Sequence, residues 1–208
     1  VLSPVLLGLM LWFAGLHGAW IVGGILQAFW LTNLGLNQQA LNAGEPITHV
    51  FIEPFWQFFI VIGGSGSTMG LVLLYLRSRS AHLRSIGKLS IVPSMFNINE
   101  PVIFGSPVVM NPILFIPFIC APLVNATLAW TATKTHLINH VVSLAPWTTP
   151  APIGAAWSTG WDWRVIVLIA VLVTIATLIY YPFFKIYERQ LLQQELEQAA
   201  AAQPVKEA

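Results

Sequence analysis

Long stretches of this sequence contain no charged residue, and this feature limits what the chain can fold into. Residues 6–34 include no Asp, Glu, Lys or Arg, and their only ionisable group is His17. A helix needs roughly 20 apolar residues to cross the hydrocarbon core of a bilayer, so this segment is long enough to span one. The polar residues 35–53 that follow are interpreted as a connector, in which Glu45-Pro46 and Glu53-Pro54 break helices.

The composition of the whole chain supports a membrane protein and excludes several other classes. Of its residues, 56% are hydrophobic and 8% are charged, against roughly 25% charged residues in soluble domains. The net charge of +1 gives no basic field, so we expect no nucleic-acid partner. Cys120 is the only cysteine, which excludes a disulfide framework and a C-x-x-C pair. The start at Val1, without a signal-peptide pattern, is interpreted as a fragment boundary, with N-terminal sequence missing.

Glycine and proline divide the other apolar segments into pieces. Residues 55–76 are interrupted at 63–68 by the run GGSGST, which is too flexible for the middle of a helix. Irregular backbone at membrane depth is tolerated only in protein or beside a cavity, so we predict a re-entrant or broken hairpin; a small-residue surface for helix packing is the alternative. Residues 91–122 contain six prolines and predict broken helices and a second re-entrant hairpin, leading into a span near 113–130. Residues 141–158 have a similar pattern.

The fold class that follows is an all-α integral membrane protein, with polytopic transmembrane helices, re-entrant hairpins and proline-broken helices. Residues 77–88 contain four Lys or Arg residues and no acid, so the positive-inside rule places them in the cytoplasm. The last predicted span, residues 164–184, begins next to Asp162, which two tryptophans flank as at an outer interface. Residues 186–202 have the composition of a water-soluble helix, and we expect a solvated cytoplasmic extension.

The motif at residues 97–101 (NINEP) is the clearest candidate for a functional site. A carboxylate surrounded by apolar sequence is costly in lipid, so Glu100 is expected to face a cavity or a partner. Pro101 has no N–H and pushes Glu100 away from helical geometry. The amides of Asn97 and Asn99 add donors and acceptors suited to a neutral polyol. A structural carboxylate that accepts backbone hydrogen bonds at a helix break is the alternative.

Metal and nucleophile chemistry have little support in the sequence. His136 and His140 lie four residues apart, which is a metal-ligand spacing on a helix. No third ligand of the H-E-x-x-H kind accompanies them, so we expect no metal and no cofactor. An intramembrane enzyme with its own nucleophile ranks last, because no motif such as G-x-S-x-G is present.

Four blocks of the sequence resemble the enzyme IIC (EIIC) permeases of phosphotransferase systems, in the lactose, cellobiose and diacetylchitobiose family. They are residues 11–18 (LWFAGLHG), 63–70 (GGSGSTMG), 97–111 (NINEPVIFGSPVVMN) and 147–154 (WTTPAPIG). These blocks occur in the family's order and cover roughly residues 5–185. The resemblance implies that residues 1–185 are the C-terminal, sugar-binding part of an EIIC domain in a bacterial cell membrane, and 186–208 a short cytoplasmic helical tail.

The resemblance also implies which residues bind the sugar. In the family, a glutamate matching Glu100 and a histidine matching His17 hold the sugar, and tryptophans matching Trp12 and Trp147 pack against its rings. Trp12 and His17 lie about 140° apart on an ideal helix, so both face one site only if the helix bends at Gly15. The family's N-terminal helices form the dimer interface, so a homodimer through that missing half is expected.

The mechanism implied by the resemblance is group translocation of a disaccharide of the cellobiose, diacetylchitobiose or lactose type. A phosphorylated EIIB protein, whose phosphocysteine is the donor, transfers the phosphoryl group to a sugar hydroxyl. Glu100 and His17 would position that hydroxyl, with Glu100 as a candidate proton acceptor. Cys120 is expected to be a buried small hydrophobe without a role in transfer. The alternative is an ion-coupled secondary sugar transporter, in which Glu100 carries the coupling proton.

Overall fold

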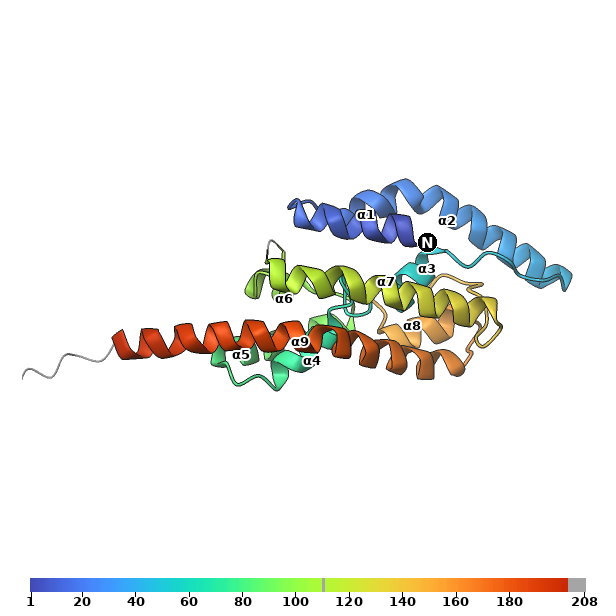
Figure 1. Cartoon of the computed structure of the whole chain (residues 1–208). Coiled ribbons are helices and arrows are strands. Elements are labelled where there is room, and N and C mark those ends of the chain that lie inside the picture. The colour runs from blue at the N-terminus through green and yellow to red at the C-terminus, as the bar shows by residue number, and fades with distance from the viewer. Residues whose placement is uncertain (110, 202–208) are drawn as a thin grey trace, which may run out of the picture.

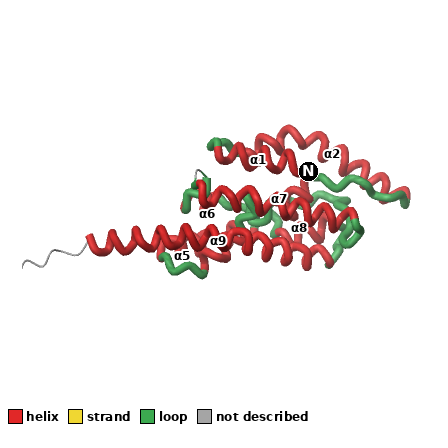
Figure 2. The backbone as a smooth tube through the Cα atoms, viewed as in Figure 1, coloured by secondary structure: helices red, strands yellow, loops and turns green. Residues whose placement is uncertain are grey.

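The computed structural model describes residues 1–109 and 111–201, and every regular element within them is a helix (Figures 1 and 2). Three helices are long and apolar enough to cross a membrane, namely α2 (Gly18–Ala43), α7 (Pro112–Lys134) and most of α9 (Arg164–Ala201). The predicted all-α membrane fold is therefore confirmed. Residues 202–208 of the predicted tail lie outside the described part of the chain.

The first apolar segment forms two helices, which corrects the single span predicted over residues 6–34. Helix α1 (Leu2–Phe13) ends before a turn in which Gly15 has a φ of 77°, and α2 begins at Gly18. A Cβ on Gly18 would overlap the backbone carbonyl of Gly8 in α1, so the two helices touch through their backbones, as small residues allow in membranes. Gly15 therefore allows the chain to reverse, and Gly8 and Gly18 allow α1 and α2 to pack closely.

The next segment is broken at its centre, as predicted. Helix α3 (Glu53–Phe55) and the π-helix η1 (Trp56–Ile60) are separated from α4 (Met69–Leu76) by residues 61–68, which are buried and not helical. The hydroxyl of Tyr180 donates to the carbonyl of Gly66 at 2.7 Å, and the hydroxyl of Thr68 donates to the carbonyl of Gly63 at 2.8 Å. Side chains thus satisfy the loop's backbone, which a segment at membrane depth requires.

The proline-rich middle third is more helical than predicted. Helices α5 (Ala81–Met95) and α6 (Glu100–Gly105) are separated by a break at residues 96–99, as expected, and α7 follows. However, Pro93 lies inside α5, and Pro117 and Pro122 lie inside α7. Membrane helices tolerate such prolines because neighbouring helices and local adjustments satisfy the freed carbonyls. This region therefore contains less irregular backbone than its six prolines predicted.

The last helix is also longer than the predicted span. After α8 (Ala151–Ser158), α9 continues from Arg164 past residue 184 into the tail. There, Glu188 accepts hydrogen bonds from the hydroxyl of Ser78 at 2.6 Å and from the backbone N–H of Arg79 at 2.7 Å. Glu195 accepts a further one from the hydroxyl of Ser80 at 2.6 Å. The tail is therefore tied to the basic loop through Glu188 and Glu195, while most of its other described residues are exposed.

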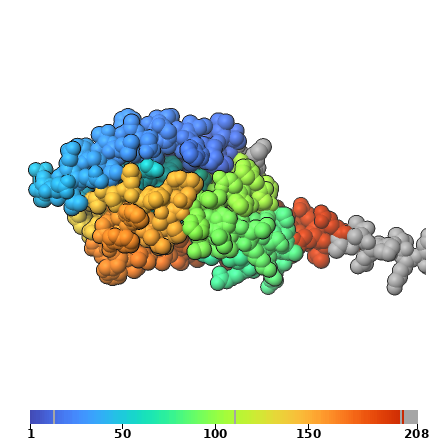
Figure 3. Space-filling view, turned by 180° about the vertical axis from the view of Figure 1, so that it is seen from behind, coloured from blue at the N-terminus to red at the C-terminus, as the bar shows by residue number. Residues whose placement is uncertain are grey.

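The helices are stacked from α1 and α2 at one edge, through α7, to α9, α4 and α5 at the other (Figure 1). Helix α7 packs against α9, α9 against α4 and α4 against α5, while α1 lies on the other side of α7 (Figure 1). Seen from behind, α1 and α2 cover one edge of the molecule, and the red end of α9 projects beyond the body (Figure 3). Helix α2 contacts α3, and the candidate site lies between α2 and the α3–η1 segment.

Candidate functional site

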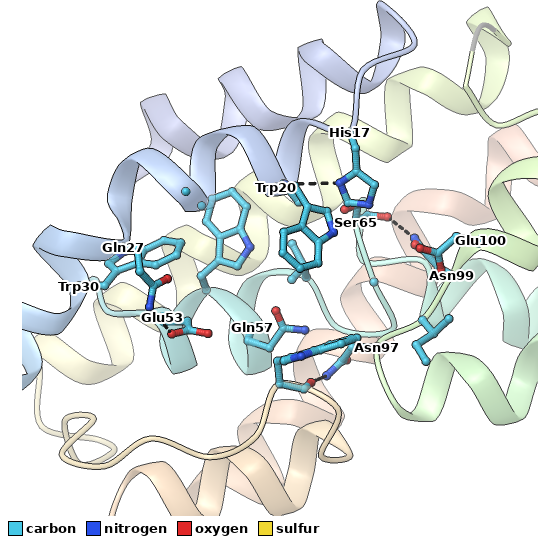
Figure 4. A pocket seen from close by; sticks show the side chains of 18 residues that line it. His17, Trp20, Gln27, Trp30, Glu53, Gln57, Ser65, Asn97, Asn99 and Glu100 are labelled. Carbon is cyan, nitrogen blue, oxygen red and sulfur yellow. Dashed lines mark hydrogen bonds between the residues drawn. The ribbon is translucent and has the colours of Figure 1, made fainter.

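A cavity of about 410 Å³ lies between α2, the α3–η1 segment, the non-helical residues 61–68 and 96–99, and the loop before α8 (Figure 4). This volume is within the range of roughly 300–1,000 Å³ that small-molecule sites occupy. Its walls combine indole rings with amide, carboxylate and imidazole groups. The described polar and aromatic residues that line it are His17, Trp20, Gln27, Trp30, Glu53, Trp56, Gln57, Ser65, Asn97, Asn99, Glu100 and Trp147.

Helix α2 provides one wall through a single face. Trp20, Gly23, Gly24, Gln27 and Trp30 all line the cavity, and their spacing of three to four residues puts them on the same side of a helix. The two glycines leave the helix surface low between the tryptophans. The wall is thus a shallow polar and aromatic surface, with open space above its centre.

His17 is held at the N-terminus of α2 by its own side chain. Its Nδ1 accepts a hydrogen bond from the backbone N–H of Trp20 at 3.4 Å, so in the neutral imidazole the proton resides on Nε2. The ring of Trp12 packs on that of His17, with centroids 4.4 Å apart. Trp12 itself is buried and does not line the cavity. The turn at Gly15 thus places Trp12 against His17, and His17 lines the cavity.

The two asparagines of the NINEP motif join the irregular segments to one another. The Asn97 carbonyl oxygen accepts from the backbone N–H of Gly63 at 3.1 Å, and its amide donates to the backbone carbonyl of Trp147 at 3.2 Å. The Asn99 amide donates to the carbonyl of Ser65 at 2.6 Å. A Cβ on Gly64 would overlap the Asn99 side chain, so this contact requires glycine. Both asparagines border the cavity, and their side chains hold its walls in place.

Glu100 begins α6 and presents its carboxylate to the cavity. Pro101 follows it in the first turn of that helix, where the missing N–H of proline has no consequence. Glu100 is exposed and, within residues 1–109 and 111–201, its side chain accepts no hydrogen bond. Glu100 and His17 line the same end of the cavity and interact electrostatically with each other (Figure 4). A free carboxylate and an imidazole thus face the same space, where a ligand hydroxyl could bind to both.

Trp147 lies in the loop before α8 and lines the cavity. It lies in a turn where the backbone N–H of Thr149 donates to the carbonyl of Pro146 at 2.9 Å, and its side chain is 48% exposed. The Asn97 side-chain amide donates to the backbone carbonyl of Trp147 at 3.2 Å, which holds this turn against the cavity. An exposed indole on a fixed turn can stack on the apolar face of a ligand.

The far end of the cavity contains residues that sequence reasoning did not select. Glu53 accepts a hydrogen bond from the side-chain amide of Gln27 at 3.1 Å, and Gln57 lies between Glu53 and the Asn97 side (Figure 4). Trp30 and Trp56 close this end, with ring centroids 5.9 Å apart. The available signal was the Glu53-Pro54 pair, which has the same residue order as Glu100-Pro101 and also begins a helix. It was interpreted only as a helix break.

Other candidate residues lie outside the cavity. Cys120 is exposed on α7, which corrects the expectation that it is buried, and it does not line the cavity. His136 and His140 have ring centroids 5.8 Å apart. No group of three or more His, Cys, Asp or Glu side chains in the described residues could hold a metal ion.

Comparisons with known proteins agree with one another. The family model described as "Phosphotransferase system, EIIC" matches residues 5–122. The lichenan permease IIC component of Bacillus subtilis (strain 168) is 41% identical over 206 residues, which cover 96% of this chain and 46% of that protein. The lactose-specific EIICB component of Streptococcus mutans is 37% identical over 199 residues, which cover 95% of this chain and 35% of that protein.

A solved structure shares the fold. The transporter ChbC, described as the IIC component of the N,N'-diacetylchitobiose-specific phosphotransferase system, superimposes with a TM-score of 0.90 at 38% identity. The match covers 93% of this chain and 45% of that one. This chain therefore spans less than half the length of each of these three proteins.

Proposed function

The chain belongs to the phosphotransferase system EIIC family, and from this membership we propose that it is the sugar-binding part of a disaccharide permease. The observation that supports the proposal most directly is the cavity whose one end is lined by Glu100 and His17. Relatives named for lichenan, lactose and N,N'-diacetylchitobiose favour a sugar of the cellobiose, lactose or diacetylchitobiose type. Residues 1–185 would form this part, and 186–208 the tail.

The lining matches the chemistry of a sugar. Each ring has an apolar face of C–H groups and a rim of hydroxyls, and the cavity is lined by the indoles of Trp20 and Trp147 together with hydrogen-bonding side chains. Glu100 accepts from hydroxyls, the Nε2–H of His17 donates, and the Asn99 carbonyl oxygen, which accepts no hydrogen bond from a described residue, takes a further one. Trp12 supports the imidazole from behind at 4.4 Å. Asn97 positions Trp147.

The charge of the cavity favours a neutral substrate over its phosphorylated product. Glu53 and Glu100 are its carboxylates, and no Lys or Arg is among the described residues that line it. A phosphosugar carries nearly two negative charges at neutral pH, and carboxylates in a partly dry site repel it. Phosphorylation at this cavity would therefore lower the affinity for the product and promote its release.

We propose that transport proceeds by group translocation. After the sugar-binding part has moved relative to the rest of the permease, a phosphorylated EIIB reaches the sugar. A sugar hydroxyl oxygen then forms a bond to phosphorus, the bond from phosphorus to the EIIB cysteine sulfur breaks, and the hydroxyl proton passes to a base. Glu100 is suited to accept that proton, because it is exposed to the cavity and accepts no other hydrogen bond from the described chain. His17 orients the hydroxyl.

The orientation and the partners belong to the same proposal. Relatives named EIICB combine a IIC and a IIB component, which supports an EIIB partner for this chain. The basic residues 77–88 and the tail that binds them lie on one side of the molecule, and we place both in the cytoplasm, where EIIB docks. Dimerisation through N-terminal helices stays a prediction.

Sugar uptake in cells tests this function. The full-length permease is expressed in cells that contain the phosphotransferase relay and in matched cells without it, and both are offered radiolabelled cellobiose, lactose or N,N'-diacetylchitobiose. The proposal predicts uptake of one of these sugars as a phosphosugar in the first cells only. Uptake of unmodified sugar in cells without the relay, with a response to the proton gradient, would contradict it and favour ion coupling; none of the relatives named above supports that alternative.

A further inference from the structure

We propose that Glu53, oriented by Gln27, forms a second sugar subsite at the end of the cavity opposite Glu100. This inference rests on the proposed function, since it concerns how the same cavity holds a disaccharide. One ring would lie against Glu100 and His17, and the other would donate hydroxyl hydrogen bonds to Glu53. The Glu53 end would then be what makes the cavity prefer a disaccharide to a single sugar.

The arrangement of the cavity separates the two carboxylates. In the close view, Glu53 and Gln27 lie at one end, while His17 and Glu100 lie at the other (Figure 4). Trp20 and Gln57 occupy the space between them. A site with an acceptor at each end and an aromatic wall between them fits two linked rings better than one, because a single ring can engage only one end.

The Glu53 carboxylate has capacity for a ligand. It is half-buried, it accepts one hydrogen bond, from Gln27 to Oε2, and no ion pair with a described Lys, Arg or His accompanies it. An ionised carboxylate has about four acceptor positions. In a membrane protein an unpaired acid normally faces a polar cavity or a partner. The open Oε1 of Glu53, in the wall of the cavity, has this environment.

The alternative is a purely structural role, in which Glu53 only caps its helix or joins two helices. Capping has no support, because α3 has three residues and no side-chain cap hydrogen bond. The bond to Gln27 does join α3 to α2, so a structural role must be separated from binding by experiment. A structural tie would affect all ligands and the stability of the protein together, whereas a subsite would affect only ligands long enough to reach it.

Binding of matched ligands to the full-length protein makes this separation. Affinities are measured for whichever of cellobiose, lactose and N,N'-diacetylchitobiose binds most tightly, and for its constituent monosaccharides, together with the melting temperature. The variants are Glu53→Gln, which removes the charge, and Gln27→Leu, which keeps the size but removes the amide that orients Glu53. Glu45→Gln is the matched control, since Glu45 also precedes a proline but is exposed and outside the cavity.

We expect Glu53→Gln to weaken disaccharide binding about tenfold, as a hydrogen bond to a charged group changes to one with a neutral group. Gln27→Leu should cause a smaller loss, while monosaccharide affinity and the melting temperature stay near wild type in both. Unchanged disaccharide affinity, or equal losses for both ligand sizes, would overturn the subsite and leave the proposed function standing. A wild-type protein that binds none of the three disaccharides would instead overturn the proposed function, and the subsite with it.

Discussion

Asn97 donates a hydrogen bond from its side-chain amide to the backbone carbonyl of Trp147 across 3.2 Å, which joins two segments that lie fifty residues apart. The same side chain accepts from the backbone N–H of Gly63 at 3.1 Å. Its φ of 60° lies in the left-handed region that asparagine tolerates better than most residues. One amide thus fixes the relative positions of three irregular segments around the cavity.

Replacing this amide should loosen the cavity. Asn97→Ala loses these two hydrogen bonds and a third, from the amide to the carbonyl of Thr149 at 3.4 Å, each worth about 1 kcal/mol or more when buried groups are left unpaired. We expect a clearly lower melting temperature and sugar affinity reduced at least tenfold, because Trp147 loses its anchor. Gln38→Ala is the control, since it removes a single exposed amide-to-carbonyl bond to Val142. Equal effects of the two variants would show that Asn97 has no special positioning role.

The tail should stabilise the protein without taking part in sugar binding. Glu188 is buried and accepts from Ser78 and Arg79, and it pairs with Lys185 at 2.8 Å. Glu188→Ala leaves those donors unpaired, and the loss of hydrogen bonds to a charged group costs about 1.5–3 kcal/mol each. We expect a lower melting temperature with normal sugar affinity. The exposed Glu197→Ala on the same helix should have no effect, and a matching loss there would refute the tail contact.

Low pH should weaken the hydrogen bonds that Asp162 makes at the start of α9 with Arg164 and Asn139. Burial of Asp162 opposes its ionisation, but hydrogen bonds from Arg164 at 2.8 Å and from the Asn139 backbone N–H at 2.8 Å outweigh this effect and lower the pKa of Asp162. The ionised form therefore stabilises the fold above the ordinary pKa of about 3.9, and this contribution is lost as the pH falls through the lowered pKa.

Melting temperatures as a function of pH would detect this contribution. Asp162→Asn should melt below wild type at pH 7, and the difference should narrow as the pH falls from about 4 through the lowered pKa of Asp162. Glu45→Gln provides the exposed control. A difference between Asp162→Asn and wild type that is the same at every pH would mean that the charge of Asp162 contributes nothing.

The proposed orientation can be tested with an impermeant thiol reagent on intact cells. Cys120 is exposed, so Cys120→Ser forms the background, and it should retain sugar phosphorylation because EIIB supplies the phosphocysteine. Cysteines at the exposed positions Ser85 and Trp163 then report on opposite ends of the molecule. We expect labelling at position 163 and protection at 85, which becomes labelled only after the cells are opened. Labelling at 85 alone in intact cells would reverse the topology.

Much of the fold could be predicted because glycine, proline and charge act locally. The break at residues 63–68 followed from backbone freedom. The expectation that Pro101 keeps Glu100 out of helical geometry was wrong, because Glu100 begins α6 and the break lies just before it, at residues 96–99. The spans at α7 and α9 followed from apolar length. What the sequence could not show was tertiary compensation. Pro117 and Pro122 are accommodated inside α7, since the neighbouring packing that allows this is not visible in the local sequence.

The candidate site was predicted in part for a similar reason. Glu100 and His17 line the cavity, but Trp12 lies behind the imidazole, and the turn at Gly15 replaced a single long helix. Composition cannot distinguish one span from two helices that reverse at a glycine. The sequence did not indicate Glu53 as a cavity residue, because its contact with Gln27 at 3.1 Å depends on how α2 packs against α3. Contacts between segments 26 residues apart have no signature in either segment alone.

Glu100→Gln tests the proposal that Glu100 holds the sugar hydroxyl that EIIB phosphorylates. This change keeps the size of the side chain but removes the charge and the proton-accepting oxygen. Binding, melting temperature and EIIB-dependent phosphorylation are measured on full-length protein, with Glu45→Gln as the control. We expect affinity to fall about tenfold or more, phosphorylation to fall by a further factor of about 10²–10⁴, and the melting temperature to stay near wild type. Unchanged binding and phosphorylation in a well-folded Glu100→Gln variant would contradict the assignment of this cavity as the sugar site.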